Sequence, residues 1–225
     1  MIKTISIADI QLDNYSAKEA VMKLEQFWDE PVLHVVEEIP MELLIKAQSE
    51  TAIKSFIQQM DLTVIADEQI LKLADVSDSR REREIREHHF FYEVLKRLER
   101  NHKRLFLVGQ SENKVEQLRE LIQEEFHKCQ IVGVEAIENC NGAIDGIINE
   151  INAATVDVIL SVIPVPQQES FLMENKEKIS AKLWYGIGSE AMDKSKRGIG
   201  SWFRKHSHRR KLEEHIANFE ETDQV

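Results

Sequence analysis

The residues best suited to chemistry in this chain follow an apolar segment. Residues 156–162 are apolar except for Asp157 and Ser161, which is typical of a strand buried on both faces. After Pro166, the loop PVPQQE brings together Gln167, Gln168 and Glu169. Ligands of open α/β sheets bind just outside the carboxyl ends of such strands. The loop is therefore either a binding site or an ordinary strand-to-helix connection, and by itself it favours neither.

Asp67 is a second candidate, because it follows the predicted strand 62–66. A carboxylate at the end of a strand can accept a proton from a bound hydroxyl as a general base. It can equally serve as the N-cap of the next predicted helix, residues 68–73. Both interpretations stay open on the sequence.

Glycines end two further predicted strands. Gly109 closes strand 104–109, and the turn through Gln110 leads to a helix with Ser111 as its expected N-cap. This order of elements presents helix amides to phosphates, although one glycine is a weaker signal than G-x-G-x-x-G. Gly186 and Gly188 lie in strand 182–188 and would allow a ligand to approach the backbone closely.

Strands and helices alternate along most of the chain, which predicts an α/β fold: a Rossmann-like, mostly parallel sheet with helices on both faces. The charged run SDSRREREIRE, residues 77–87, is most simply a solvated helix face. The remaining predicted strands are 2–10, 32–36 and 130–134, and the remaining predicted helices are 17–28, 41–47, 50–60, 88–101, 112–126, 143–154 and 169–178.

Composition narrows the functional class. The 225 residues are 42% hydrophobic and carry a net charge of −11, so we expect one main domain that does not bind nucleic acid. The two cysteines form no CxxC pair, which favours a reducing compartment. The opening residues do not resemble a signal peptide, and no apolar run reaches the roughly 20 residues of a membrane span. We expect a cytoplasmic protein.

The charge changes sign near the end of the chain. Residues 194–211 contain eight Lys and Arg residues and no acid, which leaves 29 − 8 = 21 basic residues against 40 acidic ones elsewhere. We therefore divide the chain into a Rossmann-like domain, 1–193, and a basic helical appendage, 194–225. Trp202 and Phe203 beside Arg204 suit a helix lying on a membrane surface. A helix packed on its own domain is the alternative.

Several blocks of sequence, in order, resemble the WecG/TagA/CpsF family of bacterial glycosyltransferases over about residues 7–210. The chain reads IADIQLDNYSAKEAV, RLFLVGQ, IVGVE, VDVILSVIPVPQQESFL and LWYGIG, where the family has an opening strand, loop and helix, then VFLLGG, IVG, a strand ending in GVPKQE-x-W, and GVGGSFD. Family members are cytoplasmic enzymes that transfer N-acetylmannosamine or a related sugar from a UDP donor to a lipid-linked diphosphate sugar.

The resemblance implies roles for individual residues. Asp67 matches the proposed base that deprotonates the acceptor hydroxyl, and Gln168 matches a glutamine that binds substrate and steadies charge. Glu169 would hold uridine or ribose hydroxyls beside Pro166. Gly109 and Gln110 fall on the phosphate-side loop, and Gly186 and Gly188 on the GVG strand end. Arg204, Arg209 and Arg210 would stabilise the leaving diphosphate.

The resemblance also implies membrane contact through the appendage, at the inner face of the cell membrane, and a homo-oligomer, since family members often form trimers. No metal or cofactor is expected. The sequence lacks a DxD motif, its nearest approach being Asp75 and Asp78 with two residues between them. A single displacement at the anomeric carbon requires only one base and a stabilised leaving group.

Departures from the family pattern keep three hypotheses open. Glu38, Ile39 and Pro40 stand where the family has T-x-N, Glu68 replaces a glycine, Gln110 replaces the second glycine of GG, and residues 84–89 replace R-V-T-G-x-D. The first hypothesis is an inverting, metal-independent sugar transferase. The second is a catalytically inactive relative that binds UDP-sugar or serves as a scaffold in the same pathway. The third is a nucleotide-binding α/β domain unrelated to sugars, which leaves the basic appendage unexplained.

Overall fold

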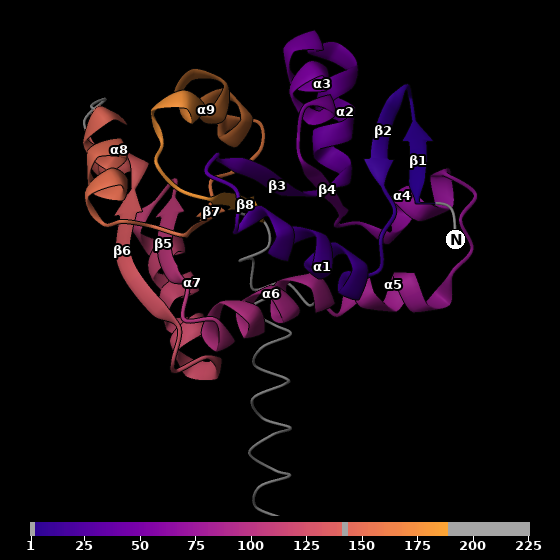
Figure 1. Cartoon of the computed structure of the whole chain (residues 1–225). Coiled ribbons are helices and arrows are strands. Elements are labelled where there is room, and N and C mark those ends of the chain that lie inside the picture. The colour runs from indigo at the N-terminus through magenta and orange to yellow at the C-terminus, as the bar shows by residue number, and fades with distance from the viewer. Residues whose placement is uncertain (1–2, 141–143, 189–225) are drawn as a thin grey trace, which may run out of the picture.

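The computed structural model describes residues 3–140 and 144–188 of the chain. Within these residues, six parallel strands form one sheet in the order β4-β3-β8-β7-β5-β6 (Figure 1). Every residue of the central strands β7 and β8 is buried. The strands are β3 (His34–Ile39), β4 (Leu62–Ile65), β5 (Arg104–Gly109), β6 (Gln130–Ala136), β7 (Val158–Val162) and β8 (Leu183–Gly186). Because they are parallel, their carboxyl ends share one edge of the sheet.

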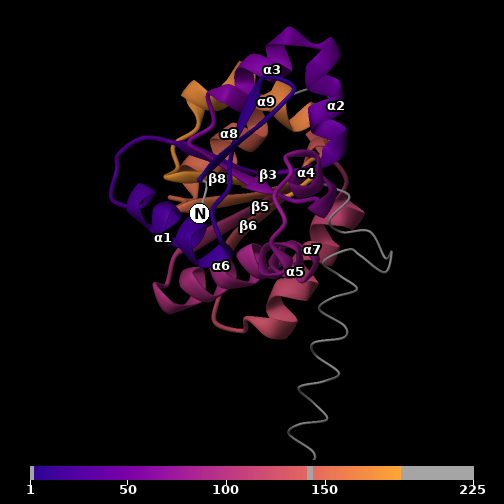
Figure 2. The ribbon, with the colours of Figure 1, turned by 90° about the vertical axis from the view of Figure 1, so that its right-hand side faces the viewer.

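Helices cover both faces of the sheet, which confirms the predicted α/β fold. Figure 2 shows α2, α3, α8 and α9 above the strands and α5, α6 and α7 below them. The apolar sides of α1, α6 and α7 form one core with the sheet, and those of α8 and α9 form another. The helices are α1 (Ala17–Phe27), α2 (Met41–Ser49), α3 (Thr51–Gln58), α4 (Glu68–Leu73), α5 (Ser79–Arg86), α6 (His89–Arg100), α7 (Glu112–Glu125), α8 (Ile144–Ala153) and α9 (Gln167–Asn175), with short 3₁₀ helices η1 (Ile137–Cys140) and η2 (Lys176–Lys178).

The first segment does not join the main sheet, and the prediction of a single strand over residues 2–10 is wrong. The chain reverses at Ala8 and Asp9, whose φ angles of 47° and 62° are those of a tight hairpin turn. The result is an antiparallel pair, β1 (Thr4–Ile7) and β2 (Ile10–Asp13). Its apolar side chains pack with α2, α3 and α4 in a third core cluster. Weak alternation in the sequence fits either arrangement, and only the turn distinguishes them.

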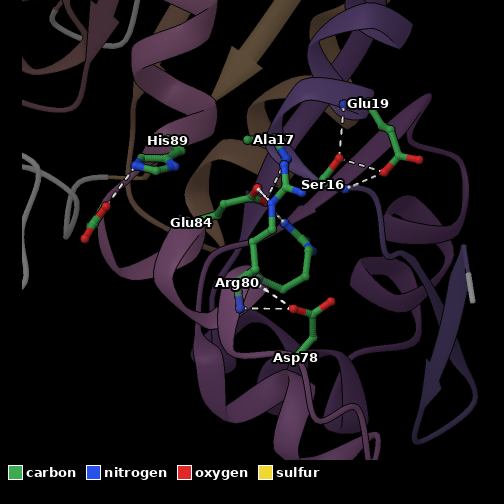
Figure 3. A network of polar contacts seen from close by, with 9 residues as sticks. Ser16, Ala17, Glu19, Asp78, Arg80, Glu84 and His89 are labelled. Atoms are coloured by element: carbon green, nitrogen blue, oxygen red, sulfur yellow. Dashed lines mark hydrogen bonds and ion pairs between the residues drawn. The ribbon is translucent and has the colours of Figure 1, made fainter. Parts of the chain in front are cut away.

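Polar residues fix the starts of several helices. Ser16 and Glu19 form a reciprocal capping box at α1, as Figure 3 shows. Asp78 accepts bonds from the backbone amides of Arg80 and Arg81 at α5. These caps satisfy amides that have no partner within the helix.

The appendage predicted at 194–225, with Arg204, Arg209 and Arg210, lies outside the described residues. The proposed domain boundary after residue 193 lies outside them as well. Among the helices that are described, every one is too short or too polar to span a bilayer.

Helix α5 corrects the prediction of a purely solvated charged face. Its outer residues are exposed, but Arg81 and Glu84 are buried. The Arg81 guanidinium lies 3.0 Å from Oε2 of Glu84, and the backbone amide of Ala17 donates to the same oxygen at 3.0 Å. Figure 3 shows Glu84 between Ala17 and Arg80. Nε of Arg80 donates a hydrogen bond to the other carboxylate oxygen of Glu84, Oε1. This network ties α5 to the start of α1.

We predict that Arg81→Met lowers the free energy of unfolding by about 3 kcal/mol, because it leaves the buried Glu84 carboxylate without its main partner. Urea denaturation measures this loss. The double variant Arg81→Met/Glu84→Leu should lose less than the sum of the two single variants, since it removes both charges together. Additive losses would contradict a coupled buried pair.

Candidate functional site

Two of the predicted site residues, Asp67 and Gln168, lie at the carboxyl edge of the sheet. Asp67 follows β4, and Gln168 belongs to α9, which follows β7. Gln168 lies over Gly186 of β8, so β3 alone separates its position from β4. Two strand spacings of about 4.8 Å correspond to about 10 Å across the sheet.

A row of small and polar residues crosses the sheet just before this edge. Thr63 of β4 pairs in register with Glu37 of β3, Glu37 with Gly186 of β8, and Gly186 with Ser161 of β7. Residues in register on parallel strands point to the same face. The row shares its face with Trp184 and Ile159, which pack with α8 and α9. Polar side chains thus lie beneath α9.

Helix α9 begins at Gln167, two residues earlier than predicted, with Pro166 as its N-cap after a cis Val165–Pro166 peptide. Gln168 and Glu169 therefore belong to the first helical turn and point inward, both fully buried. The side-chain oxygen of Gln168 accepts a bond of 3.4 Å from Nε1 of Trp184. Its amide nitrogen has no hydrogen-bond partner among the described residues.

Gly186 explains how Gln168 fits. A Cβ atom at position 186 would lie 2.2 Å from the Gln168 amide nitrogen, far inside contact distance. Glycine at 186 therefore makes room for the side-chain amide of Gln168. Gly188 has a φ of 67°, and no atom of the described residues lies within 4 Å of a Cβ added there. The roles of Gly186 and Gly188 toward a ligand stay predictions.

Glu37 and Glu169 form a buried pair. The sequence analysis identified Glu169 as a candidate but missed Glu37. Both side chains are fully buried, and no oxygen of either carboxyl has a conventional hydrogen-bond donor among the described residues. Burial and the adjacent Glu169 carboxyl raise the pKa of Glu37 well above its usual range. Burial also raises the pKa of Glu169. Two consecutive acids inside the apolar strand VVEEI were the available signal.

Glu38 points to the opposite face of β3. The Tyr185 hydroxyl donates a hydrogen bond to its carboxyl. Burial raises the pKa of Glu38 to about 7, and the Tyr185 bond lowers it in part. Glu38 also lines a pocket of about 20 Å³ with Tyr15, Arg81 and Glu84. That volume holds about one water molecule.

Asp67 caps α4, since its Oδ1 accepts a bond of 2.8 Å from the amide of Gln69. This is the structural alternative that the sequence left open, and it is confirmed. The bond uses one carboxylate oxygen, and the residue is half-buried at the carboxyl edge. Capping therefore does not exclude the role of base, which stays a prediction.

The carboxylate of Glu138 lies at the turn after β5. Gly109 is buried at the end of β5, where an added Cβ would lie 3.0 Å from both Val115 and Val162. Ser111 makes no side-chain cap, and Glu138 supplies one instead by accepting a 2.7 Å bond from the amide of Glu112. A phosphate bound beside Gln110 would have to lie near that carboxylate. The phosphate-side roles of Gly109 and Gln110 stay predictions.

Within residues 3–140 and 144–188, no three His, Cys, Asp or Glu side chains are grouped as metal ligands are. Arg204, Arg209 and Arg210, expected to meet the diphosphate, lie outside this part of the chain.

Comparison with known families identifies the protein class. The family model described as "Glycosyl transferase WecG/TagA/CpsF family" matches residues 5–193, most of the chain. The chain belongs to this family. The WecG/TagA/CpsF assignment implies a glycosyltransferase of cell-surface polysaccharide synthesis. A search of curated proteins gave no match.

One departure from the WecG/TagA/CpsF pattern is partly compensated in the fold. Glu68, where the family has glycine, pairs with Arg86 at 3.1 Å and with Lys72 at 3.7 Å. These cations reduce the repulsion that Glu68 alone would exert on a bound diphosphate. Ile39 is fully buried at the end of β3, and Pro40 caps α2. The Asn position of the family's T-x-N is therefore without a polar side chain, and Glu38 at the Thr position is buried against Tyr185.

We predict that Gly186→Ala destabilises the protein by about 1–3 kcal/mol, because the new methyl group overlaps the buried Gln168 amide. Thermal and urea denaturation measure the loss. Gly146→Ala on α8, where the added Cβ meets nothing within 4 Å, is the matched control and should be neutral or stabilising. Equal effects of the two changes would contradict close packing of Gln168 on Gly186.

We also predict that Glu38→Gln changes how stability depends on pH. The folded pKa of about 7 exceeds the reference value of 4.5, so the free energy of unfolding of the wild type falls as pH rises between these values. The amide keeps an acceptor for Tyr185 without taking up charge. At pH 8 the variant should be more stable by up to about 3 kcal/mol, and near pH 4 it should equal the wild type.

Denaturant unfolding at several pH values measures this difference. Glu42→Gln, on an exposed position of α2, is the control and should change stability little at any pH. A Glu38→Gln variant that follows the wild-type pH dependence would contradict a neutral buried carboxyl at position 38.

Proposed function

We propose that this protein transfers an N-acetylhexosamine, similar to N-acetylmannosamine, from a UDP donor to a lipid-linked diphosphate sugar. The pathway is cell-surface polysaccharide or teichoic acid synthesis. The observation that carries the proposal is that Asp67 and Gln168, matched to the family's functional positions, lie at the same carboxyl edge of the sheet. Ligands of open α/β sheets bind just outside this edge, which supports the proposal.

Asp67 acts as the base in this proposal. It accepts the proton of the acceptor hydroxyl as that oxygen attacks the anomeric carbon, in a single displacement that inverts configuration. Its Oδ1 is held by the α4 amide, which fixes the direction of the carboxylate. Gln168 contributes to donor binding from the first turn of α9. Glu169 is buried against Glu37 and supports α9 from within.

Leaving-group stabilisation falls to the basic residues of 194–211 in this proposal. Arg204, Arg209 and Arg210 would neutralise the diphosphate of the departing UDP, a task suited to fixed positive charge. The same segment would attach the protein to the inner face of the cell membrane and to its lipid-linked acceptor. We propose no metal ion, since the sequence offers no DxD pair, and we expect a homo-oligomer such as a trimer.

A second candidate is an inactive relative that binds UDP-sugar or serves as a scaffold in the same pathway. Two observations favour it. Asp67 already has a structural role as the α4 cap, and the T-x-N positions carry no comparable polar set. The two candidates differ in turnover and agree in fold.

We predict that Asp67→Asn lowers turnover by about 10²- to 10⁴-fold, because asparagine cannot take up the acceptor proton. Asparagine still caps helices, so the fold should be kept. The measurement is UDP release from UDP-N-acetylmannosamine with a lipid-diphosphate acceptor. Asp78→Asn repeats the same substitution at another helix cap and should leave turnover unchanged.

The outcomes separate the candidates. UDP release by the wild type that is lost in Asp67→Asn supports the transferase. A wild type that binds UDP in a thermal-shift assay but releases none from the donor supports the scaffold. Equal turnover of the wild type and Asp67→Asn would remove Asp67 as the base.

A further inference from the structure

Five buried polar atoms beneath α9 have no conventional hydrogen-bond partner among the described residues. They are both carboxyl oxygens of Glu37, both of Glu169, and the amide nitrogen of Gln168. Unpaired buried polar groups are costly, so native proteins contain few of them, and each requires an explanation. Because these five atoms lie close together at the candidate site, we look for one explanation that satisfies them together.

A proton satisfies the two carboxyls together. Ionised carboxylates only accept hydrogen bonds, so Glu37 and Glu169 repel each other when both are charged. When one of them is protonated, its hydroxyl donates to the other, and the pair carries one negative charge in place of two. Buried carboxyls in contact share protons in this way elsewhere in proteins. Burial and the neighbouring acid both act to keep a proton on Glu37.

Of the side chains around Glu37, the carboxyl of Glu169 is the one positioned to share its proton. On the β4 side, Thr63 pairs with Glu37 in register, but its hydroxyl bonds to Asp13. On the β8 and β7 sides, Gly186 has no side chain, and the Ser161 hydroxyl, which accepts from the amide of Ile163, makes no hydrogen bond to either oxygen of Glu37.

Among residues 3–140 and 144–188, the helices over this face place no cation that acts on Glu37. The Gln168 side chain of α9 acts in the opposite direction and lowers the pKa of Glu37, but less than burial and the neighbouring Glu169 raise it. Lys54 of α3 reaches the carbonyl of Ala8, in the hairpin turn.

We propose that Glu37 is a positioning residue: one proton shared between Glu37 and Glu169 holds the first turn of α9, and with it the Gln168 amide, over Gly186. Glu169 and Gln168 are adjacent in that turn, so a displacement of the Glu169 carboxyl also displaces the Gln168 side-chain amide. Loss of the proton places two charges in an apolar interior and displaces the turn outward. The consequence for substrate binding rests on the proposed function, whereas the displacement of α9 does not.

The pH dependence has a definite sign. Glu37 holds its proton more tightly in the folded protein than in the unfolded chain, so the stabilisation is complete at low pH and is lost as pH rises through the folded titration. Between the ordinary pKa of the open state and the raised pKa of the folded state, opening of the α9 turn becomes up to tenfold easier per pH unit, and above the folded pKa it levels off. Glu37→Gln replaces the proton with an amide that donates to Glu169 at any pH.

The direct test is backbone amide exchange of residues 168–172 between pH 6 and 9, corrected for the intrinsic effect of pH on exchange. We expect protection in the wild type to fall as pH rises and protection in Glu37→Gln to stay nearly constant. Glu169→Gln should behave as Glu37→Gln does, since either amide can bond to the remaining carboxylate. Equal pH dependence in the wild type and both variants would overturn the proposal.

Glu38→Gln is the matched control, because Glu38 is adjacent, buried and titrates above its usual range but points to the other face. It should change global stability and leave the pH dependence of α9 protection as in the wild type. Carbon NMR of the wild-type carboxyls adds a measurement that needs no variant. Ordinary titration of both Glu37 and Glu169 near pH 4 would also overturn the proposal.

UDP binding measured over the same pH range connects the pair to function. We expect wild-type affinity to weaken as pH rises, following the loss of α9 protection, and Glu37→Gln to bind with little pH dependence. If UDP fails to bind at every pH while α9 protection behaves as expected, the proposed function fails and the shared proton stands. If UDP binds and its affinity follows the same pH profile in both proteins, Glu37 has no positioning role.

Discussion

The close approach of α9 to β8 is the contact on which the candidate site depends. Gln168 can lie flat on the sheet because position 186 has no side chain, and the Trp184 indole holds the oxygen of its amide. This packing brings the first turn of α9 down to the carboxyl edge. The same turn carries Glu169 into the interior, against Glu37. A larger residue at 186 would lift the turn and change every contact beneath it.

Acidic residues at this edge are each accommodated by a different neighbour. Glu38 accepts from the Tyr185 hydroxyl, Glu68 pairs with Arg86, and Glu84 pairs with Arg81. The fixed positive charges of Arg86 and Arg81 lie close to their carboxylates, so those acids act weakly on anything bound nearby. Burial instead raises the pKa of Glu38 to about 7, so a substantial fraction of this carboxyl is neutral at neutral pH. The net charge of −11 therefore overstates the repulsion that an anionic donor would meet at this edge.

Strand β3 directs acidic side chains toward the helical layers on both faces of the sheet. Glu37 points toward α9 and Glu38 toward α1, α5 and α6, because successive side chains on a strand alternate. Both lie one or two residues before the carboxyl end, where ligands of parallel sheets bind. A strand with consecutive buried acids is costly to fold, since each carboxyl must find a donor, a cation or a proton.

Several features of this protein can be predicted from short stretches of sequence. Apolar runs such as residues 104–109 and 156–162 predict buried strands, Ser16 predicts the cap of α1, and the order of motif blocks predicts the family. These signals depend on neighbouring residues, so they can be read without a structure. The turn at Ala8 and Asp9 was missed because non-glycine residues with positive φ leave little trace in a sequence.

Contacts between distant segments were decided by the tertiary structure alone. Glu37 meets Glu169, and Gln168 meets Gly186, only after the chain has crossed the sheet and α9 has packed on it. Arg81 and Glu84 look like solvated charges in sequence and become a buried pair because α1 covers them. Sequence patterns report which residues prefer an interior, but the partner that satisfies a buried charge is set by long-range packing.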